Sequence, residues 1–319
     1  MTRGGLAPFP RGTVVTVGSF DGMHLGHQAI LREVRERTAR AGAASLLVTF
    51  EPHPAAVLAP GSAPARLTVG VERAEIAAEL GLDGVLVLRF DRKLAERSAE
   101  AFVREILLER CGMRELVLGA DHGFGKDRRG DSRTLPGMGE RLGFGVTVVP
   151  AVTDSRGAPI KSTHIRAAIG AGDLARAAEW LGRPYRITGR VVAGAGRGKT
   201  IGVPTINLDA PPPDKALPPD GVYAARVEWG GGTAGAMLNQ GPRPTVGDAR
   251  RTLEAHLFGV GAELAGRTVR LEWVDRLRDI RRFASLEALK AQLAQDRVHA
   301  LAILAGRPET STARPTGAR

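Results

Sequence analysis

The chain has 319 residues, of which 43% are hydrophobic and 4% aromatic, and its formal net charge at pH 7 is +11. This length and apolar content allow two domains with a core each, and they exclude a chain that is disordered throughout. The positive charge indicates a polyanionic partner, but so few aromatic residues argue against a surface that stacks nucleic-acid bases, and nucleotide phosphates satisfy the charge equally well.

A single cysteine, Cys111, excludes an internal disulfide and a cysteine-rich metal site. It follows an apolar helical run and is predicted to be a small buried hydrophobe. The sequence has no apolar stretch of the roughly 18 residues that a membrane span requires, and residues 1–12 lack the apolar core of a signal peptide. We therefore expect a cytoplasmic protein with no membrane partner.

Short apolar strands alternate with helical patterns over residues 13–150. A strand at 13–17 and a helix at 25–40 come first. The apolar stripe of this helix consists of Ile30, Leu31 and Val34. The segments SLLVTF, VERAEIAAELG, GVLVLRF, SAEAFVREILLERC, ELVLGA and GVTVVP follow. This alternation predicts a doubly wound parallel α/β sheet of Rossmann type, in which ligands bind beyond the carboxyl ends of the strands.

The segment GSFDGMHLGH, residues 18–27, joins the first strand to the first helix and places two histidines three residues apart on the first helical turn. A helix N-terminus offers unpaired backbone N–H groups and a partial positive charge, and both stabilise phosphoryl oxygens. The glycines of the segment let the backbone approach a ligand closely. Strand, turn and helix together therefore predict a nucleotide-phosphate site that contains His24 and His27.

From Tyr185 onward the pattern changes to strands that glycines and prolines separate. These strands are YRITGRVVAG, GVYAARVEW, GTAGAMLN, RTLEAHLF and RTVRLEWV, and the long helix SLEALKAQLAQDRVHALAIL follows them. The order predicts a small antiparallel β-barrel with a terminal helix. The helical stretch GDLARAAEWLG precedes the change, so we expect a first domain at 1–183 and a second at 184–306. The polar residues 307–319 are expected to form a disordered tail.

A glycine-rich run before the tripeptide GKT, residues 198–200, first suggests a phosphate-binding P-loop. The spacing GxxxxGK[ST] requires glycine at position 193, where this chain has Ala193. The residues that follow, IGVPTINL, contain a proline and several β-branched residues, which do not readily form the helix that a P-loop requires. We therefore do not expect a P-loop here.

The string GSFDGMHLGHQ resembles the nucleotidylyltransferase signature in the form found in the prokaryotic bifunctional riboflavin kinase and FAD synthetase family. TFEPHP at 49–54, the loop at 119–130 and KSTHIR at 161–166 resemble further strings of that family. The resemblance implies that the phosphate of FMN attacks the α-phosphorus of ATP, giving FAD and pyrophosphate. The catalytic residues that it implies are His24, His27 and Arg166. The binding residues that it implies are Gly18, Phe20, Asp21, Gly26, Asp121, Phe124, Ser162 and Thr163.

Four residues in these strings depart from the usual family pattern. Lys161 and His164 stand where the string SSTRIR has serine and arginine. His122 and Gly123 replace the usual Phe and Arg of GxDFRFG. These departures leave open an alternative in which the kinase works and the first domain is a weakened or non-catalytic adenylyltransferase.

GRVVAGAGRGKTIGVPTINL, residues 189–208, resembles the riboflavin kinase signature, in which a glycine-rich loop covers the ATP phosphates and a PTAN segment holds the metal. Here that segment reads PTIN, and Thr205 and Asn207 alternate to one face of an extended chain, as joint coordination of Mg²⁺ through oxygen requires. The ATP-binding residues that the resemblance implies are Gly196, Arg197, Gly198, Lys199, Gly202 and Pro204.

NQGPRPTVG, TLEAHLFG and RDIRRFASLEALKAQLAQD resemble further kinase strings. In the second of them, Glu254 is the predicted general base, which accepts the proton of the ribityl 5′-hydroxyl as that oxygen attacks the γ-phosphorus of ATP. The resemblance covers about residues 13–305 and implies conversion of riboflavin to FMN and of FMN to FAD, with ATP, Mg²⁺ and these flavins as ligands.

A further alternative is a basic regulatory protein that binds flavin nucleotides or RNA without catalysis. The combination of Glu254, Thr205 and Asn207 argues against it, because a protein that only binds needs no general base next to a metal site. We therefore expect small-molecule substrates and no nucleic-acid partner, and the sequence leaves the oligomeric state open.

Overall fold

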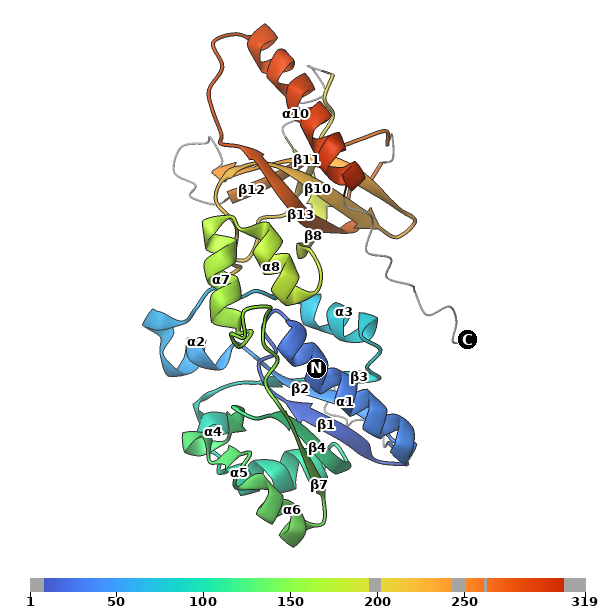
Figure 1. Cartoon of the computed structure of the whole chain (residues 1–319), viewed down its shortest axis with the longest axis vertical. Coiled ribbons are helices and arrows are strands. Elements are labelled where there is room, and N and C mark those ends of the chain that lie inside the picture. Colours follow the sequence, from blue (N-terminus) through green and yellow to red (C-terminus); the bar gives the residue numbers. More distant parts are fainter. Residues whose placement is uncertain (1–8, 195–201, 243–250, 261–262, 307–319) are drawn as a thin grey trace. The chain divides into compact units, whose positions relative to one another are not determined.

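The computed structural model describes residues 9–194, 202–242, 251–260 and 263–306 (Figure 1). They fold into two compact units. The first unit takes the described residues up to Ala65 together with Arg73–Ser162, and the second takes Arg66–Glu72 and the described residues from Thr163 onward. The domain boundary expected between residues 183 and 184 stays a prediction, and the expected tail at 307–319 lies outside the described residues.

A parallel five-stranded sheet in the order β3-β2-β1-β4-β7 forms the centre of the first unit, as predicted. Its strands are β1 (Thr13–Val17), β2 (Ala44–Glu51), β3 (Gly84–Arg89), β4 (Met113–Gly119) and β7 (Gly145–Val149). Successive residues of β1 face opposite sides of the sheet. Val14 packs with Val34 of the first helix, whereas Val15 and Val17 pack in the cluster that contains Phe102. The sheet is therefore buried on both faces, which explains the continuous apolar runs of its inner strands.

Helices connect these strands. They are α1 (Leu25–Ala41), α2 (Pro54–Leu58), α3 (Glu72–Glu79), α4 (Arg92–Ala95), α5 (Ala99–Phe102) and α6 (Leu135–Leu142). Short pieces complete the unit: two 3₁₀ turns, Pro60–Ser62 and Lys126–Arg128, and a small hairpin of β5 (Gly123–Phe124) and β6 (Gly130–Asp131). The single helix predicted at 98–111 is α5 followed by a π-helical stretch, Val103–Leu108. Cys111 is buried, as predicted, and burial raises the pKa of its thiol to about 11.

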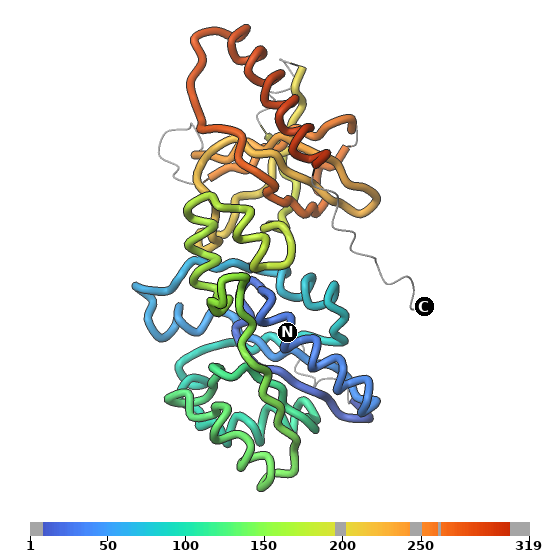
Figure 2. The backbone as a smooth tube through the Cα atoms, viewed as in Figure 1, coloured from blue at the N-terminus to red at the C-terminus, as the bar shows by residue number. Residues whose placement is uncertain are grey.

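A closed antiparallel barrel forms the second unit, with the strand order β10-β11-β12-β9-β8-β13, and this confirms the predicted barrel. The strands are β8 (Tyr185–Val192), β9 (Ile206–Leu208), β10 (Gly221–Trp229), β11 (Gly232–Pro242), β12 (Arg251–Leu257) and β13 (Thr268–Arg278). Its helices are α7 (Ser162–Ala171), α8 (Leu174–Leu181) and α10 (Leu286–Gly306). In Figure 2, α10 is the long red helix along the barrel, and Ala300 packs there against Ala224, Met237 and Val274.

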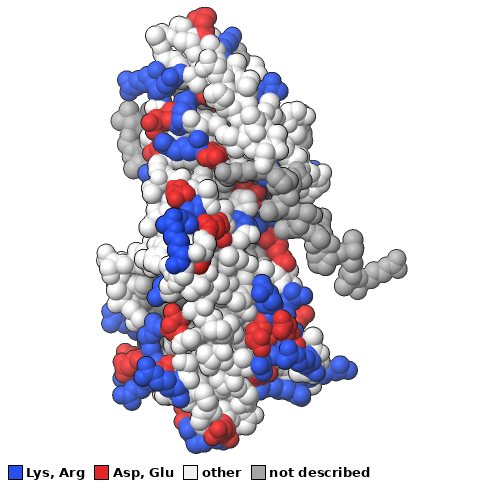
Figure 3. All heavy atoms as spheres, viewed as in Figure 1, with Lys and Arg blue, Asp and Glu red and all other residues white. Residues whose placement is uncertain are grey.

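The outer surface of the chain carries charges of both signs. On the face drawn in Figure 3, lysine and arginine side chains are interspersed with aspartate and glutamate. Every helix of the described ranges is too short or too polar to cross a membrane. The net positive charge of the chain therefore does not form a purely basic surface on this face.

A buried ion pair holds the segment Arg66–Glu72 in the barrel unit, although the rest of that unit begins almost 100 residues later. Lys215 Nζ donates to the Glu72 carboxylate at 2.8 Å, and the two side chains are only 0% and 2% exposed. The same ammonium donates to the carbonyl oxygens of Leu67 at 2.8 Å and Arg186 at 2.9 Å. A buried charge is stable only when it is fully paired. The Lys215 ammonium therefore needs the Glu72 carboxylate and both carbonyl oxygens, and Glu72 needs Lys215.

Replacing Lys215 by Met should therefore destabilise the barrel unit by about 3 to 5 kcal/mol, since Glu72 would keep a buried charge without its cation. Urea unfolding followed by tryptophan fluorescence measures this unit alone, because all three tryptophans, Trp180, Trp229 and Trp273, belong to it.

A matched control is Arg251→Met, which breaks the ion pair with Asp220, where the side chains are 49% and 33% exposed. We expect this variant to lose less than about 1 kcal/mol. A Lys215→Met protein that unfolds at the same urea concentration as the control would contradict the role assigned to the buried pair.

Candidate active sites

The turn between β1 and α1 has an unusual backbone that burial maintains. Phe20 and Met23 have positive φ angles of 46° and 40°, in a region that non-glycine residues rarely adopt. Their side chains are buried with Leu31, Leu47 and Ile76. Packing of these two side chains therefore offsets the cost of the turn, and the turn delivers His24 to the start of α1.

The two predicted histidines lie together at the N-terminus of α1. His24 Nδ1 accepts a hydrogen bond from the backbone N–H of His27 at 3.4 Å, so His24 is the N-cap of the helix. The two rings stack with their centroids 3.7 Å apart, and the Phe20 ring lies 4.8 Å from that of His27. Because Nδ1 of His24 accepts, the proton of its neutral ring is on Nε2, which can donate to an anionic oxygen.

The remaining predicted residues of this signature pack around the histidines. A Cβ on Gly26 would lie 3.1 Å from Cε1 of His24, and a Cβ on Gly18 would lie 3.1 Å from the Phe20 ring. Asp21 is buried, and its carbonyl accepts a hydrogen bond from the Ser162 hydroxyl at 2.9 Å. The structure therefore brings Ser162 to this turn, whereas Thr163 and Arg166 belong to the second unit and stay predictions.

Arg73 is a buried residue at this site that the sequence analysis missed. Its guanidinium donates to the Ser19 carbonyl at 3.2 Å, to Thr49 Oγ1 at 3.1 Å and to the Phe50 carbonyl at 3.1 Å, and it pairs with the Glu51 carboxylate. One cation thus holds the signature turn and the TFEPHP segment together. In the sequence, an arginine on the first turn of a short helix resembles any solvated surface arginine, so pattern alone does not reveal it.

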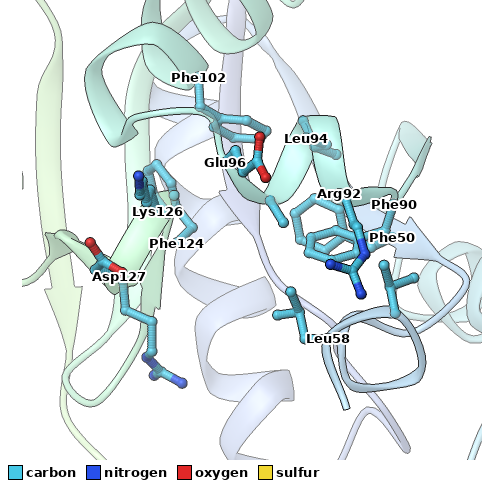
Figure 4. A pocket seen from close by; sticks show the side chains of 14 residues that line it. Phe50, Leu58, Phe90, Arg92, Leu94, Glu96, Phe102, Phe124, Lys126 and Asp127 are labelled. Carbon is cyan, nitrogen blue, oxygen red and sulfur yellow. The ribbon is translucent and has the colours of Figure 1, made fainter. Parts of the chain in front are cut away.

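A pocket of about 420 Å³ opens between β2, α4, α5 and the 119–130 loop (Figure 4). Four phenylalanines dominate its lining: Phe50, Phe90, Phe102 and Phe124. Phe50 meets Phe90 edge to face at 5.5 Å, and Phe102 lies 5.3 Å from Phe124. Figure 4 shows Arg92 on one side of the pocket and Lys126 on the other. The pocket is therefore apolar within, and charges of both signs line its edges, since Glu96 and Asp127 join the three basic residues there. Of the lining residues, only Phe124 was predicted to belong to a site.

The 119–130 loop carries two of the departures from the family pattern. Burial is the main reason why the pKa of His122 is lowered to about 4, so this ring is neutral near pH 7. Its Cε1 atom would lie 3.3 Å from a Cβ on Gly18, so the ring packs against the signature turn. Asp121, predicted to bind ligand, is exposed beside it. His122 thus supplies an uncharged aromatic ring where the family usually has phenylalanine.

Glu254 lies on β12 between two asparagines of neighbouring strands. It stands opposite Asn207 of β9 and Asn239 of β11 in the two ladders. Thr205 Oγ1 donates to the Glu254 carboxylate at 2.6 Å. The structure therefore brings the predicted base and both predicted metal ligands together and adds Asn239, which the sequence analysis did not single out.

A cavity of about 560 Å³ adjoins these polar groups. Thr205, Asn239 and Glu254 lie in its lining. Its apolar lining residues are Val203, Val222, Met237, Ile280, Phe283, Leu289 and Leu293, and Arg278 and Arg281 add positive charge. A cavity with polar and basic groups on part of a largely apolar wall suits a ligand with an apolar body and a polar, anionic end.

The glycine-rich segment before β9 is described only at its two ends. Gly196, Arg197, Gly198 and Lys199 lie outside the described residues. Gly202 has a φ of 79°, and Pro204 is exposed. At the other end, a Cβ on Gly194 would lie only 2.0 Å from Nδ2 of Asn207, so the position of the Asn207 side chain requires a glycine there.

The donor chemistry of this site fits a hard cation. In the described part of the chain, no group of three or more His, Cys, Asp and Glu side chains could hold a metal by itself. Thr205 and Asn207 present oxygen donors beside Glu254. Mg²⁺ binds through a few protein oxygens together with substrate phosphates, so two neutral oxygens are a suitable protein contribution.

Comparison with known proteins shows to which family this chain belongs. Residues 6–164 match the sequence model of FAD synthetase, and residues 181–304 match that of riboflavin kinase. The bifunctional riboflavin kinase/FMN adenylyltransferase of Pseudomonas fluorescens is 40% identical over 94% of this chain and 96% of its own length. The chain belongs to this bifunctional family.

Two further known proteins are similar to this chain. The Escherichia coli K12 riboflavin kinase/FMN adenylyltransferase is 39% identical over 91% of this chain and 92% of its own length. A crystal structure described as a macrolide-efflux protein from Streptococcus pneumoniae has a TM-score of 0.79 at 31% identity, over 91% of this chain and 94% of that chain. Both the FAD synthetase and the riboflavin kinase domains of the family are therefore present here, each with its own fold.

Replacing Gly194 by Ala should lower FMN formation from riboflavin at least about tenfold, because the added methyl group displaces the Asn207 side chain. FAD formation from supplied FMN reports the other domain and should not change. The matched control is Gly230→Ala, since no atom lies within 4 Å of a Cβ at Gly230. Equal kinase rates in the two variants would contradict the role of Gly194. Chromatography of the flavins measures both reactions.

Proposed function

We propose that this chain phosphorylates riboflavin to FMN in the barrel unit and adenylylates FMN to FAD in the parallel-sheet unit. The observation that carries the proposal is the hydrogen bond of Thr205 to Glu254, at the wall of a largely apolar cavity and opposite Asn207. A carboxylate next to oxygen donors for a cation is the arrangement that phosphoryl transfer to a hydroxyl requires.

In the kinase reaction, Glu254 is the general base. Its carboxylate takes the proton of the ribityl 5′-hydroxyl while that oxygen forms a bond to the γ-phosphorus of ATP, and the bond from this phosphorus to the bridging oxygen of ADP breaks. Thr205 donates to the same carboxylate at 2.6 Å and so fixes its orientation. The apolar wall of the cavity excludes water, which would otherwise compete for the phosphoryl group.

Thr205 and Asn207 are the proposed holders of Mg²⁺, and Gly202, Pro204 and the glycine-rich residues Gly196 to Lys199 are the proposed ATP contacts. When bound, Mg²⁺ neutralises charge on the phosphates. The protein contributes the placement of the two oxygens: Asn207 is held by its ladder with Glu254, and Thr205 by its hydrogen bond to the same residue.

In the adenylyl transfer, a phosphate oxygen of FMN forms a bond to the α-phosphorus of ATP, and the bond to the leaving pyrophosphate breaks. His24 and His27, at the N-terminus of α1, are proposed to donate to the oxygens of the transferring phosphoryl group, where the helix N–H groups add positive potential. Ser162 is proposed to hold the pyrophosphate, with Gly18, Phe20, Asp21, Gly26 and Asp121 forming the rest of the nucleotide site. The pyrophosphate contacts expected of Thr163 and Arg166 stay predictions.

The phenylalanine pocket of the first unit is the proposed site for the flavin ring of FMN. Its aromatic lining, which includes Phe50 and Phe124, offers ring faces and edges to a flat heteroaromatic system. Lys126 and Arg128 lie in the lining and would attract the FMN phosphate. Location in the cytoplasm and the absence of a nucleic-acid partner stay predictions.

A second candidate is a riboflavin kinase whose first domain binds nucleotide without turnover. It is favoured by the departures at His122, Gly123, Lys161 and His164. Against it, His122 keeps an aromatic ring against Gly18 and Lys161 keeps a positive charge. The alternative differs from the proposal in one product, since it forms FMN but no FAD.

Two variants test the assignment of one reaction to each unit. Glu254→Gln keeps the shape of the side chain but removes the base, so FMN formation should fall about 10² to 10⁴-fold while FAD formation from supplied FMN is unchanged. His27→Ala should do the reverse, with FAD formation lowered about 100-fold or more. Each variant is the control for the other. A Glu254→Gln protein that forms FMN at the parental rate would refute the mechanism.

A further inference from the structure

His256 shares a face of β12 with Glu254, two residues away. Alternate residues of a strand point to the same side, so both side chains line the same cavity. His256 also lines a second cavity, of about 630 Å³, together with Gly202 and Pro204. His256 has no role in the transfer of the phosphoryl group described above, although it lines both cavities.

The imidazole of His256 holds the residue that precedes Thr205. Its Nδ1 lies 2.7 Å from the carbonyl oxygen of Pro204. A carbonyl oxygen only accepts, so Nδ1 is the donor and carries a proton. The Phe258 ring meets the imidazole edge to face, with the ring planes at 74° and the centroids 5.7 Å apart, and this packing sets the plane of the ring.

Thr205 and the residue before it lie outside the strand pairing that holds β9. Pairing between β9 and β12 runs from Leu208 to Ile206 and ends there. Beyond that point two side chains of β12 hold two consecutive residues: His256 binds the Pro204 carbonyl, and Glu254 binds the Thr205 hydroxyl. Without the first bond, only the second would hold Thr205 beyond the end of the β9–β12 ladder.

We propose that His256 is a positioning residue of the riboflavin kinase. By holding the carbonyl of Pro204, it sets the direction in which Thr205 donates its proton to Glu254 and would offer its oxygen to Mg²⁺. The inference rests on the proposed kinase function. Although His256 lines the cavity, its proposed role is exerted through the backbone carbonyl of Pro204 and not on the transferring group.

Three substitutions at this position separate the Nδ1 bond from other properties of the ring. In His256→Asn, the amide nitrogen takes the place of Nδ1 and can still donate to Pro204. In His256→Gln, the amide nitrogen takes the place of Nε2 instead, and in His256→Phe the ring remains but has no donor. Only the asparagine variant should therefore keep the segment in place.

We expect His256→Phe and His256→Gln to bind MgADP about tenfold more weakly by calorimetry and to lose about tenfold in kcat for FMN formation, as the loss of one hydrogen bond predicts. His256→Asn should stay within about threefold of the parent in both measurements. KM for riboflavin should change less than about twofold in all three, because the apolar residues of the cavity wall are unchanged.

Tryptophan fluorescence during thermal unfolding and FAD formation from supplied FMN confirm that each variant is folded. Parental MgADP binding by the phenylalanine variant, or equal rescue by glutamine and asparagine, would overturn the positioning role. Failure of the proposed function is recognised separately, since the parent protein itself would then form no FMN.

Discussion

The register of β12 against its two neighbours is the constraint on which the kinase half of the molecule depends. This register places Glu254 opposite Asn207 and Asn239. A slip of one residue would turn Glu254 to the other face of the barrel. His256 lies two residues after Glu254 and so shares its face of β12, and one strand supplies both the base and the residue that holds the segment before β9. The Thr205 hydrogen bond is a consequence of this register rather than its cause.

In the parallel-sheet unit, the functional groups are positioned differently, because its site is made from loops at the ends of strands. The short β5–β6 hairpin pairs part of one loop with itself, and buried side chains hold the signature turn to the neighbouring strand. Phe20 and Met23 fix the turn by packing, and Arg73 ties that turn to the segment after β2 by hydrogen bonds to carbonyl oxygens. Both units therefore position polar groups with side chains that take no part in the chemistry.

The sequence predicts a large part of this arrangement, and the remainder has a physical reason. Strands with continuous apolar runs depend on local chemistry and are found as predicted. The motif of fixed spacing likewise places His24 and His27 at the N-terminus of α1. The roles of Asn239 and Gly194 depend on contacts with other strands: Asn239 stands opposite Glu254, and Gly194 leaves room for the Asn207 side chain. Arg73 and Lys215 are buried cations, which sequence patterns do not distinguish from the solvated ones that are far more common.

The most direct test of the central claim is a time course on the unmodified chain with riboflavin, ATP and Mg²⁺, in which chromatography separates riboflavin, FMN and FAD. The account predicts that FMN appears first and that FAD then forms at its expense. FMN that accumulates without FAD would contradict the second activity, and the absence of both products would contradict the enzymatic account of either unit.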